Sequence, residues 1–273
     1  SRIFFIMLRT CQYSLYKCDS IIDIKLFKDT AMLLHQDLCS IQQDAKQLDT
    51  LGQNGKNVLY QTVPSMSYMR CSWYQHSMLP PRVPAPLYEN ERKEEIAIAY
   101  DVHHHDFPKE GLIYDSYQVF MKDVVDQFYF LSQYLQFIPS IEQYKTSNDM
   151  RDDLRRGKLR YLPTEETWEY EDKDYYMYNT VQVRGKTIII NDMFRIVHDA
   201  FAHSAGFSFN SYGEYFSWWV HRDSIRPLGR YALFCETRAQ NIWTNHLPQH
   251  ADLPVSERPF PRPKAVLYDK SIV

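Results

Sequence analysis

Residues 191–203 read NDMFRIVHDAFAH, a stretch that combines the apolar spacing of a helix with a dense set of ionisable side chains. Phe194, Val197 and Phe201 recur at intervals of three and four residues, which predicts a helix with an apolar face. Asp192 precedes this pattern and is expected to cap the helix at its amino end. Because charged side chains stand within an apolar pattern, this stretch bears on both fold and function.

Further helices are predicted on both sides of this stretch. Upstream, an apolar stripe at helical spacing predicts a core helix over 116–137, and Asn148 is placed to cap a short helix that follows it. Downstream, a second helix is predicted over about 213–221. A third is expected from Pro227, which suits a first helical position, through Ile242.

One small β-hairpin is predicted between these helices. Val181 and Val183 lead into Arg184-Gly185-Lys186, and the residues that follow, 187–190, are again rich in β-branched side chains around this glycine turn. The expected fold class is therefore α+β and mainly α-helical, with a helical core and a single hairpin.

Extended arms are predicted to flank a core domain at 111–246. Residues 19–110 are expected to form a helical and proline-rich arm, with helical apolar spacing over 20–51. Over 63–88, prolines among tyrosine, methionine and tryptophan favour extended backbone over helix or central strand. The tail 247–273 is again proline-rich and is expected to be extended.

The composition excludes several classes of protein. The 273 residues are 44% hydrophobic, as in a globular chain, and a formal charge of −3 gives no bulk positive field for nucleic acid. Five scattered cysteines without a C-x-x-C pair argue against a disulfide framework. The chain has only 8 glycines and lacks a phosphate-loop motif, which disfavours the common classes of nucleotide-binding enzyme.

The apolar run 3–8 is far shorter than the roughly 20 residues of a membrane span, so no transmembrane span is predicted.

Residues 1–18 have the composition of a mitochondrial targeting segment. Arg2 and Arg9 alternate with apolar and aromatic residues, and no acidic residue precedes Asp19. Met7 opens the phrase Met-Leu-Arg-Thr, which is typical of a presequence start. An ordinary basic helix is the alternative, and cleavage of the segment is left open.

Three of the predicted helices carry side chains of metal-ligand type. Asp199 and His203 are four residues apart and Glu214 and His221 are seven apart, so each pair is expected to share a helix face. Glu236 stands on the third helix. Such a set suits zinc, iron or manganese in a helical bundle. The candidate ligands are His198, Asp199, His203, Glu214, His221 and Glu236, with His198 either ligating or orienting.

Purely structural roles fit the same residues. Asp199 is able to pair with Arg195, Glu214 to satisfy amides in a first helical turn, and Glu236 to pair with a neighbouring arginine. Buried histidines also commonly satisfy one another. The three histidines at 103–105 are interpreted as a solvated loop, because adjacent side chains do not easily converge on one ion.

The same segments resemble a largely uncharacterised family of phage and bacterial proteins. Residues 191–203 resemble that family's phrase NDxFRxVHDxFGH, residues 213–221 its GEExxWxxH, and residues 236–243 its ETRGQNxW. A looser match extends back through Tyr117 and 151–163, so the resemblance covers roughly the last 160 residues, a domain-sized length.

The sequence departs from the family phrases at three positions. Ala202 and Ala239 replace glycines, and Tyr215 replaces the second glutamate of the GEE phrase. The resemblance thus implies that a possible ligand or general base is missing at Tyr215.

The first functional hypothesis is an accessory, non-catalytic subunit of a mitochondrial inner-membrane assembly. In this hypothesis, the subunit is built on an enzyme-like domain with a vestigial site. The preferred assembly is the ATP synthase or another respiratory complex. The targeting-type start and the aromatic, proline-rich arms, which suit ordering against partner subunits, favour it. Membrane association is then expected through those partners, with no direct binding of nucleic acid.

The second hypothesis is a metal-dependent, hydrolase-like enzyme. Here the His/Asp/Glu set holds one or two ions, and Arg238 is expected to face an anionic substrate.

Overall fold

The computed structural model describes residues 42–43, 46–47, 62–79, 85–88, 92–167, 174–250 and 252–273. The predicted targeting segment and nearly all of the helix expected over 20–51 lie outside these residues. The helices are α4 (Pro64–Ser77), α5 (Lys93–Val102), α6 (Leu112–Leu131), α7 (Ser147–Arg155), α8 (Ile190–Phe201), α9 (Ser211–Asp223), α10 (Arg230–Phe234) and α11 (Gln240–His246), with a π-helical segment, η7 (Cys235–Ala239), between the last two. The strands are β1 (Gln136–Pro139), β2 (Lys158–Tyr161), β3 (Thr180–Val183) and β4 (Lys186–Ile189).

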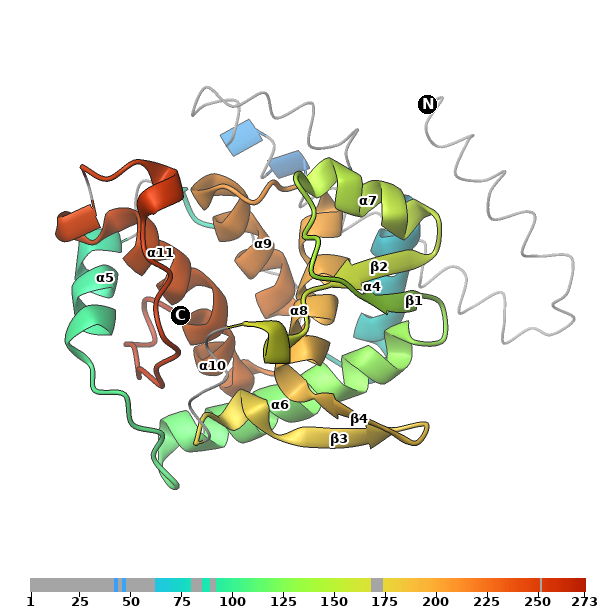
Figure 1. Ribbon diagram of the computed structural model, residues 1–273, viewed down its shortest axis with the longest axis horizontal. Coiled ribbons are helices and arrows are strands. Elements are labelled where there is room, and N and C mark those ends of the chain that lie inside the picture. Colours follow the sequence, from blue (N-terminus) through green and yellow to red (C-terminus); the bar gives the residue numbers. More distant parts are fainter. Residues whose placement is uncertain are drawn as a thin grey trace, which may run out of the picture.

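Helix α8 lies among the other helices of the core (Figure 1). It packs against α6, α4 and α9, while α11 packs along α5. Phe201, Phe216 and Trp218 are among the largest side chains that are fully buried between these helices. The mainly α-helical α+β class predicted from the sequence is confirmed.

The predicted hairpin is present as β3 and β4, which pair in antiparallel fashion. Its two turn residues, Arg184 and Gly185, both have positive φ values of 50° and 79°. This is the backbone geometry of the tight turn that matches the twist of a hairpin.

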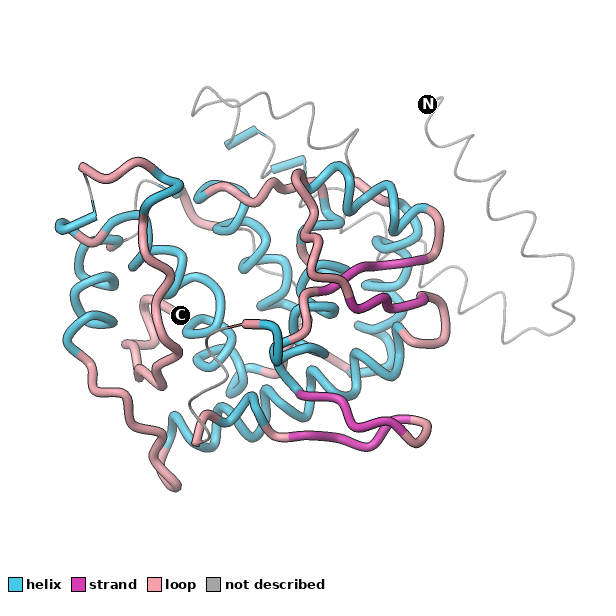
Figure 2. The backbone as a smooth tube through the Cα atoms, viewed as in Figure 1, coloured by secondary structure: helices cyan, strands magenta, loops and turns pink. Residues whose placement is uncertain are grey.

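A second small sheet was not expected. Strands β1 and β2 pair in parallel, with Gln136 opposite Lys158, and α7 connects them. Consequently, the helix predicted over 116–137 ends at Leu131, and its last expected residues belong to β1. Figure 2 shows both two-stranded sheets at the same side of a helical body.

The prediction of extended backbone over 63–88 is wrong for its first half, where α4 forms. Pro64 occupies the start of α4, where the missing N–H costs nothing because the first amides of a helix have no partner within the helix. The helix ends at Ser77, before the next prolines of the segment. The number of prolines therefore predicted extended backbone where a helix is present, because the only proline of that helix stands at its first position.

Two predicted helix caps are replaced by others. Thr146, and not Asn148, caps α7 in a reciprocal capping box with Asp149. Asp192 does not cap α8, since its carboxylate accepts hydrogen bonds from the amide and hydroxyl of Thr164.

Both predicted arms belong, in their described parts, to the same core as the domain between them. Val63 and Tyr100 on one side and Tyr268 on the other are buried in a single hydrophobic cluster with residues of α6, α8 and α9. The prediction of an extended tail over 247–273 is corrected by two 3-10 turns, η8 (Pro248–His250) and η9 (Val255–Glu257), and residues 259–269 have no regular secondary structure. The tail is held against the body, since the Lys264 ammonium donates to the Tyr100 carbonyl at 2.8 Å. The boundaries proposed near 111 and 246 do not separate independent cores.

Among the described helices, none combines the length and the hydropathy that a membrane span requires.

Candidate metal centre

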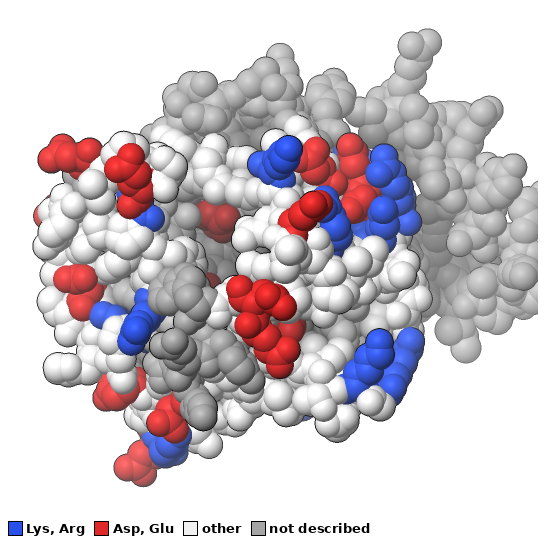
Figure 3. All heavy atoms as spheres, viewed as in Figure 1, with Lys and Arg blue, Asp and Glu red and all other residues white. Residues whose placement is uncertain are grey.

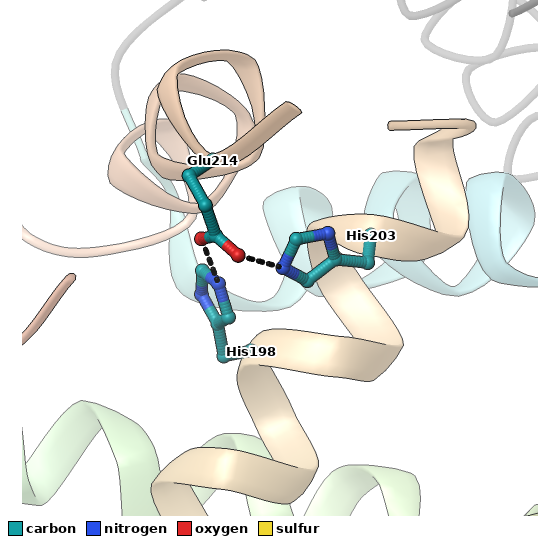
Figure 4. A group of neighbouring side chains, drawn as sticks. All are labelled: His198, His203 and Glu214. Carbon is teal, nitrogen blue, oxygen red and sulfur yellow. Dashed lines mark ion pairs between the residues drawn. The ribbon is translucent and has the colours of Figure 1, made fainter. Parts of the chain in front are cut away.

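His198, His203 and Glu214 converge between α8 and α9 (Figure 4). The Nε2 atom of His203 lies 3.4 Å from one carboxylate oxygen of Glu214, and Nε2 of His198 lies 3.8 Å from the other. One ligand atom from each residue can be chosen so that all lie within 4.8 Å of one another. Two ligands of one tetrahedral ion bound at about 2.1 Å are about 3.4 Å apart, so this geometry fits a metal ion.

The end of α8 determines which residues meet. The helix stops at Phe201 and continues as a tighter 3-10 turn, η5 (His203–Ala205), which Gly206 ends at a φ of 112°. His203 is therefore displaced from the regular helical position four residues after Asp199. As a result His198, and not Asp199, shares the carboxylate of Glu214 with His203.

The start of α9 places the third residue. Asn210 caps this helix by accepting a hydrogen bond from the Gly213 amide at 2.8 Å. Gly213 also lies against the backbone of Ser208, so closely that a Cβ built on it would be 1.8 Å from the Ser208 carbonyl oxygen. This close approach holds Glu214, the next residue, in the first turn of α9 and above the end of α8.

The environment of the three side chains is enclosed. Their side chains are 11%, 2% and 20% exposed for His198, His203 and Glu214, respectively. His203 Nδ1 lies 2.9 Å from the Ser217 hydroxyl and 3.3 Å from the Phe207 carbonyl oxygen. Since a carbonyl only accepts, Nδ1 carries the hydrogen and Nε2 is the ring atom that faces Glu214.

Charge coupling is strong within this cluster. Burial by itself would raise the pKa of Glu214, but the adjacent His203 and His198 hold the pKa of that carboxyl far below its ordinary range. Burial also opposes the charged form of His203, yet its contacts with Glu214 give a net rise of its pKa. In the absence of a metal ion, a proton that His203 shares with Glu214 balances the negative charge of the carboxylate. A divalent cation would replace that proton.

His221 lies behind the cluster and not within it. Its Nδ1 is 3.1 Å from Nδ1 of His198, and its Nε2 is 3.3 Å from the Gln127 amide oxygen. Burial lowers the pKa of His221 well below its ordinary value, so the ring is neutral. Its predicted role as a ligand is thus replaced by that of a hydrogen-bond partner to His198.

Asp199 lies near the cluster and interacts with its charges, but it is not one of the converging residues. Burial raises the pKa of its carboxyl, and His203 and His198 oppose that rise through their charges. Among the described residues, the group able to hold one ion comprises His198, His203 and Glu214 and leaves Asp199 out.

Glu236 belongs to a different buried cluster. Its carboxylate accepts hydrogen bonds from the hydroxyls of Tyr117 and Tyr175 and, at 3.2 Å, from the amide of Gln240. The expectation that three helices pool their ligands in one pocket is therefore corrected, since only α8 with its η5 extension and α9 contribute.

Arg238 does not face a substrate site as predicted. Its side chain is fully buried, and its guanidinium donates to the Ser211 carbonyl at 3.2 Å and to the Asn241 side chain at 2.6 Å. The nearby rings of Tyr88 and Tyr215 lie 5.5 Å from its guanidinium carbon. This arginine thus stabilises the packing of α9, η7 and the segment that contains Tyr88.

Sequence reasoning missed Gln127, Ser217 and the two tyrosines that bind Glu236. A signal was present for the first two: Gln127 lies in the apolar stripe of α6, and Ser217 stands within the aromatic run of α9. A polar residue at a core position indicates a buried hydrogen-bond partner. Tyr117 lies in the same apolar stripe, which predicts a core position for it, and nothing in the spacing shows that its hydroxyl reaches η7.

The charges on the surface do not form a field of one sign on the face shown in Figure 3, where basic and acidic side chains are interspersed.

No family model matches the chain, and neither a curated protein nor a solved structure is significantly similar to it.

Proposed function

We propose that this chain binds one divalent transition-metal ion through His198, His203 and Glu214, and that it serves as an accessory, non-catalytic subunit of a mitochondrial inner-membrane assembly. The observation that carries the metal site is the convergence of two imidazole Nε2 atoms on one carboxylate, at 3.4 and 3.8 Å. Two histidines and one carboxylate suit iron, zinc or manganese. When bound, the ion would supply a fixed positive charge that ties α8 to α9.

A structural role for the ion is favoured over catalysis by the surroundings of the centre. The three side chains are mostly buried. A cavity of about 710 Å³ lies elsewhere, between α4, α6 and the loop after α9, and none of the three ligands lines it. Tyr215, which stands where the resembling family has a second glutamate, turns its hydroxyl to the Pro86 carbonyl at 2.8 Å. Such an arrangement supports an inherited site that is now structural.

The test of the metal site compares two isosteric variants of buried or partly buried glutamates. Glu214→Gln removes the anionic ligand and is expected to abolish stoichiometric metal, measured by elemental analysis and by the absorption spectrum of the cobalt-loaded protein. Glu236→Gln, which changes a carboxylate held by tyrosines, is the control and is expected to retain metal. Equal metal content in wild type and Glu214→Gln, with circular dichroism showing both folded, contradicts the proposed site.

The wider role as a subunit is tested on mitochondria of the source organism. We expect the protein to migrate in a native gel with a large inner-membrane complex, the ATP synthase or another respiratory complex, and mass spectrometry of the band identifies the partners. The alternative, a metal-dependent hydrolase-like enzyme, is favoured by the His/His/carboxylate chemistry alone. Migration as a free protein, combined with metal-dependent hydrolysis that Glu214→Gln abolishes, would support that alternative.

A further inference from the structure

A line of buried polar side chains leads from α6 to the back of the candidate metal centre. Gln127 and His221 are both fully buried. The Gln127 amide nitrogen donates to the Ser224 carbonyl at 2.7 Å, and its amide oxygen lies 3.3 Å from Nε2 of His221. The other ring nitrogen of His221 contacts Nδ1 of His198 at 3.1 Å. Four residues from three parts of the chain are thus joined in sequence.

The donors and acceptors along this line have one consistent direction. Because the Ser224 carbonyl only accepts, the Gln127 amide group points its nitrogen there and its oxygen at His221. The amide oxygen also only accepts, so Nε2 of His221 carries a hydrogen. A second hydrogen on His221 would make its ring a charged imidazolium, which is unfavourable because the ring is fully buried next to another histidine. Nδ1 of His221 is therefore bare and accepts a hydrogen bond.

The same reasoning applies to the ring of His198. Its Nδ1 must carry the hydrogen that it donates to His221, so in the neutral form of His198 the atom with the free electron pair is Nε2. Nε2 is the atom that faces Glu214 at 3.8 Å. A metal ligand needs this unprotonated nitrogen, and a hydrogen bond to the opposite ring nitrogen commonly fixes it.

We infer that Gln127 and His221 are positioning residues that fix the Nδ1-protonated tautomer of His198 and so present its Nε2 atom to the metal ion. The inference rests on the proposed metal site for its purpose, while the tautomer itself is a property of the metal-free protein. It also explains why a glutamine interrupts the apolar stripe of α6, where Val124 and Leu131 on either side are fully buried.

The first measurement is the tautomer of His198 in the full, metal-free chain labelled with ¹⁵N-histidine. Long-range ¹H–¹⁵N spectra recorded above the usual histidine pKa of about 6.5 distinguish the two ring nitrogens. His198→Asn assigns the signal. We expect a protonated Nδ1 and a bare Nε2 in the wild type, and a loss of this pure state in Gln127→Met, which has no acceptor for His221.

The second measurement is the affinity for cobalt(II), read from its absorption spectrum. Gln127→Met and His221→Ala are each expected to weaken binding about 10- to 100-fold, as for other residues that orient a metal ligand. His221→Asn keeps an acceptor near the position of Nδ1 and is expected to restore part of the loss. Gln240→Met removes a different buried amide, the one that donates to Glu236, and is expected to leave both the tautomer and the affinity unchanged.

The outcomes separate the inference from the metal proposal. A wild-type His198 protonated at Nε2, or a tautomer that Gln127→Met leaves unchanged in a folded protein, overturns the inference. If the tautomer behaves as expected but the wild type binds no metal, the positioning role stands and the proposed metal site fails.

Discussion

Gly213 determines the position of Glu214 through the side chain that it lacks. A Cβ at this residue would be 1.8 Å from the Ser208 carbonyl oxygen and 2.6 Å from the Ser208 amide nitrogen, and both are backbone atoms that cannot rotate away. The glycine therefore allows the loop before α9 to pass against the first turn of the helix. The residue that follows it is the one that both histidines contact.

We expect Gly213→Ala to destabilise the protein by about 1–3 kcal/mol or more, as overpacking of a tight site does. Because the strain acts on the first turn of α9, the loss of metal affinity should exceed what the loss of stability explains at temperatures where the variant is folded. Thermal unfolding and cobalt titration measure the two effects. An unchanged melting temperature would show that the loop is free to move aside.

The residues of the candidate centre were only partly predictable. The types and the spacing of His198, His203 and Glu214 in the sequence indicated metal-ligand chemistry, and the structure brings these three side chains together. The actual grouping depends on where α8 stops, since the 3-10 turn after Phe201 rotates His203 away from Asp199. Helix ends depend on tertiary contacts, and these are not encoded in the periodicity.

At the scale of elements, the π-helical segment η7 brings Glu236 to α6. The segment runs without a break from α10 into α11, and the wider turn presents Glu236 to Tyr117 and Tyr175. Such π-helical turns occur frequently where a helix serves a specific contact. The hydroxyls of the two tyrosines satisfy a carboxylate that is 8% exposed.

Removal of one of these hydroxyls tests the cluster. Tyr117→Phe leaves a buried carboxylate with fewer donors and is expected to cost about 1.5–3 kcal/mol of unfolding free energy, the range for hydrogen bonds to charged groups. Tyr129→Phe on the same helix is the control, since Tyr129 is 40% exposed and its hydroxyl donates at the surface to the Gln182 carbonyl at 3.2 Å, and we expect a change within about 0.5 kcal/mol. Chemical denaturation of the two variants gives the comparison, and equal small losses would contradict a role for the Glu236 cluster in stability.

The packing of α11 on α5 predicts a dependence of stability on pH. Burial first, and then the nearby Lys93 and Arg238, lower the pKa of His246 to about 4. An unfolded chain takes up this proton near pH 6.5, whereas the folded protein resists it down to about pH 4. The contribution of His246 therefore lowers stability as the pH falls from about 6.5 to 4. His246→Gln is expected to lose part of the stability difference between about pH 7 and pH 5, measured by denaturation, and an unchanged difference would contradict the assignment.

Elements with regular spacing were predicted well, and elements made by few residues were not. The stripe of α6 and the glycine turn of the hairpin are local patterns, and both are present. Strands β1 and β2 have four residues each and pair in parallel across α7, so their partner is set by tertiary packing. Helix α4 was missed because proline was counted without regard to its position.

At the scale of the whole molecule, the described parts of the two arms and the core domain form one structure. The tail crosses α5 and the helical run 230–246, where the Val266 carbonyl accepts from the Cys235 thiol and the Tyr268 hydroxyl donates to the Ile96 carbonyl. Composition suggested an arm that orders only on a partner. The buried aromatic and aliphatic residues of the tail show why it orders on its own chain instead.

Two neighbouring residues of the tail provide a matched test. Tyr268→Ala removes a ring that is 6% exposed and packs against Phe234, and a loss of about 3–5 kcal/mol is expected from such a cavity. Leu267→Ala affects a side chain that is 49% exposed and should change stability by about 0.5 kcal/mol or less. Similar effects of both variants in denaturant titrations would contradict the docked tail.

The docked tail also has a consequence for synthesis of the protein on the ribosome. Residues 264–268 pack on α5 and the 230–246 helices, where Lys264 contacts Tyr100, Val266 contacts Cys235 and Tyr268 contacts Phe234. A nascent chain that has already formed these helices leaves Tyr100, Phe234 and Cys235 uncovered until residues 264–268 have been synthesised. Docking of the tail is therefore a late step of folding, because it forms contacts between residues more than 160 positions apart in the chain.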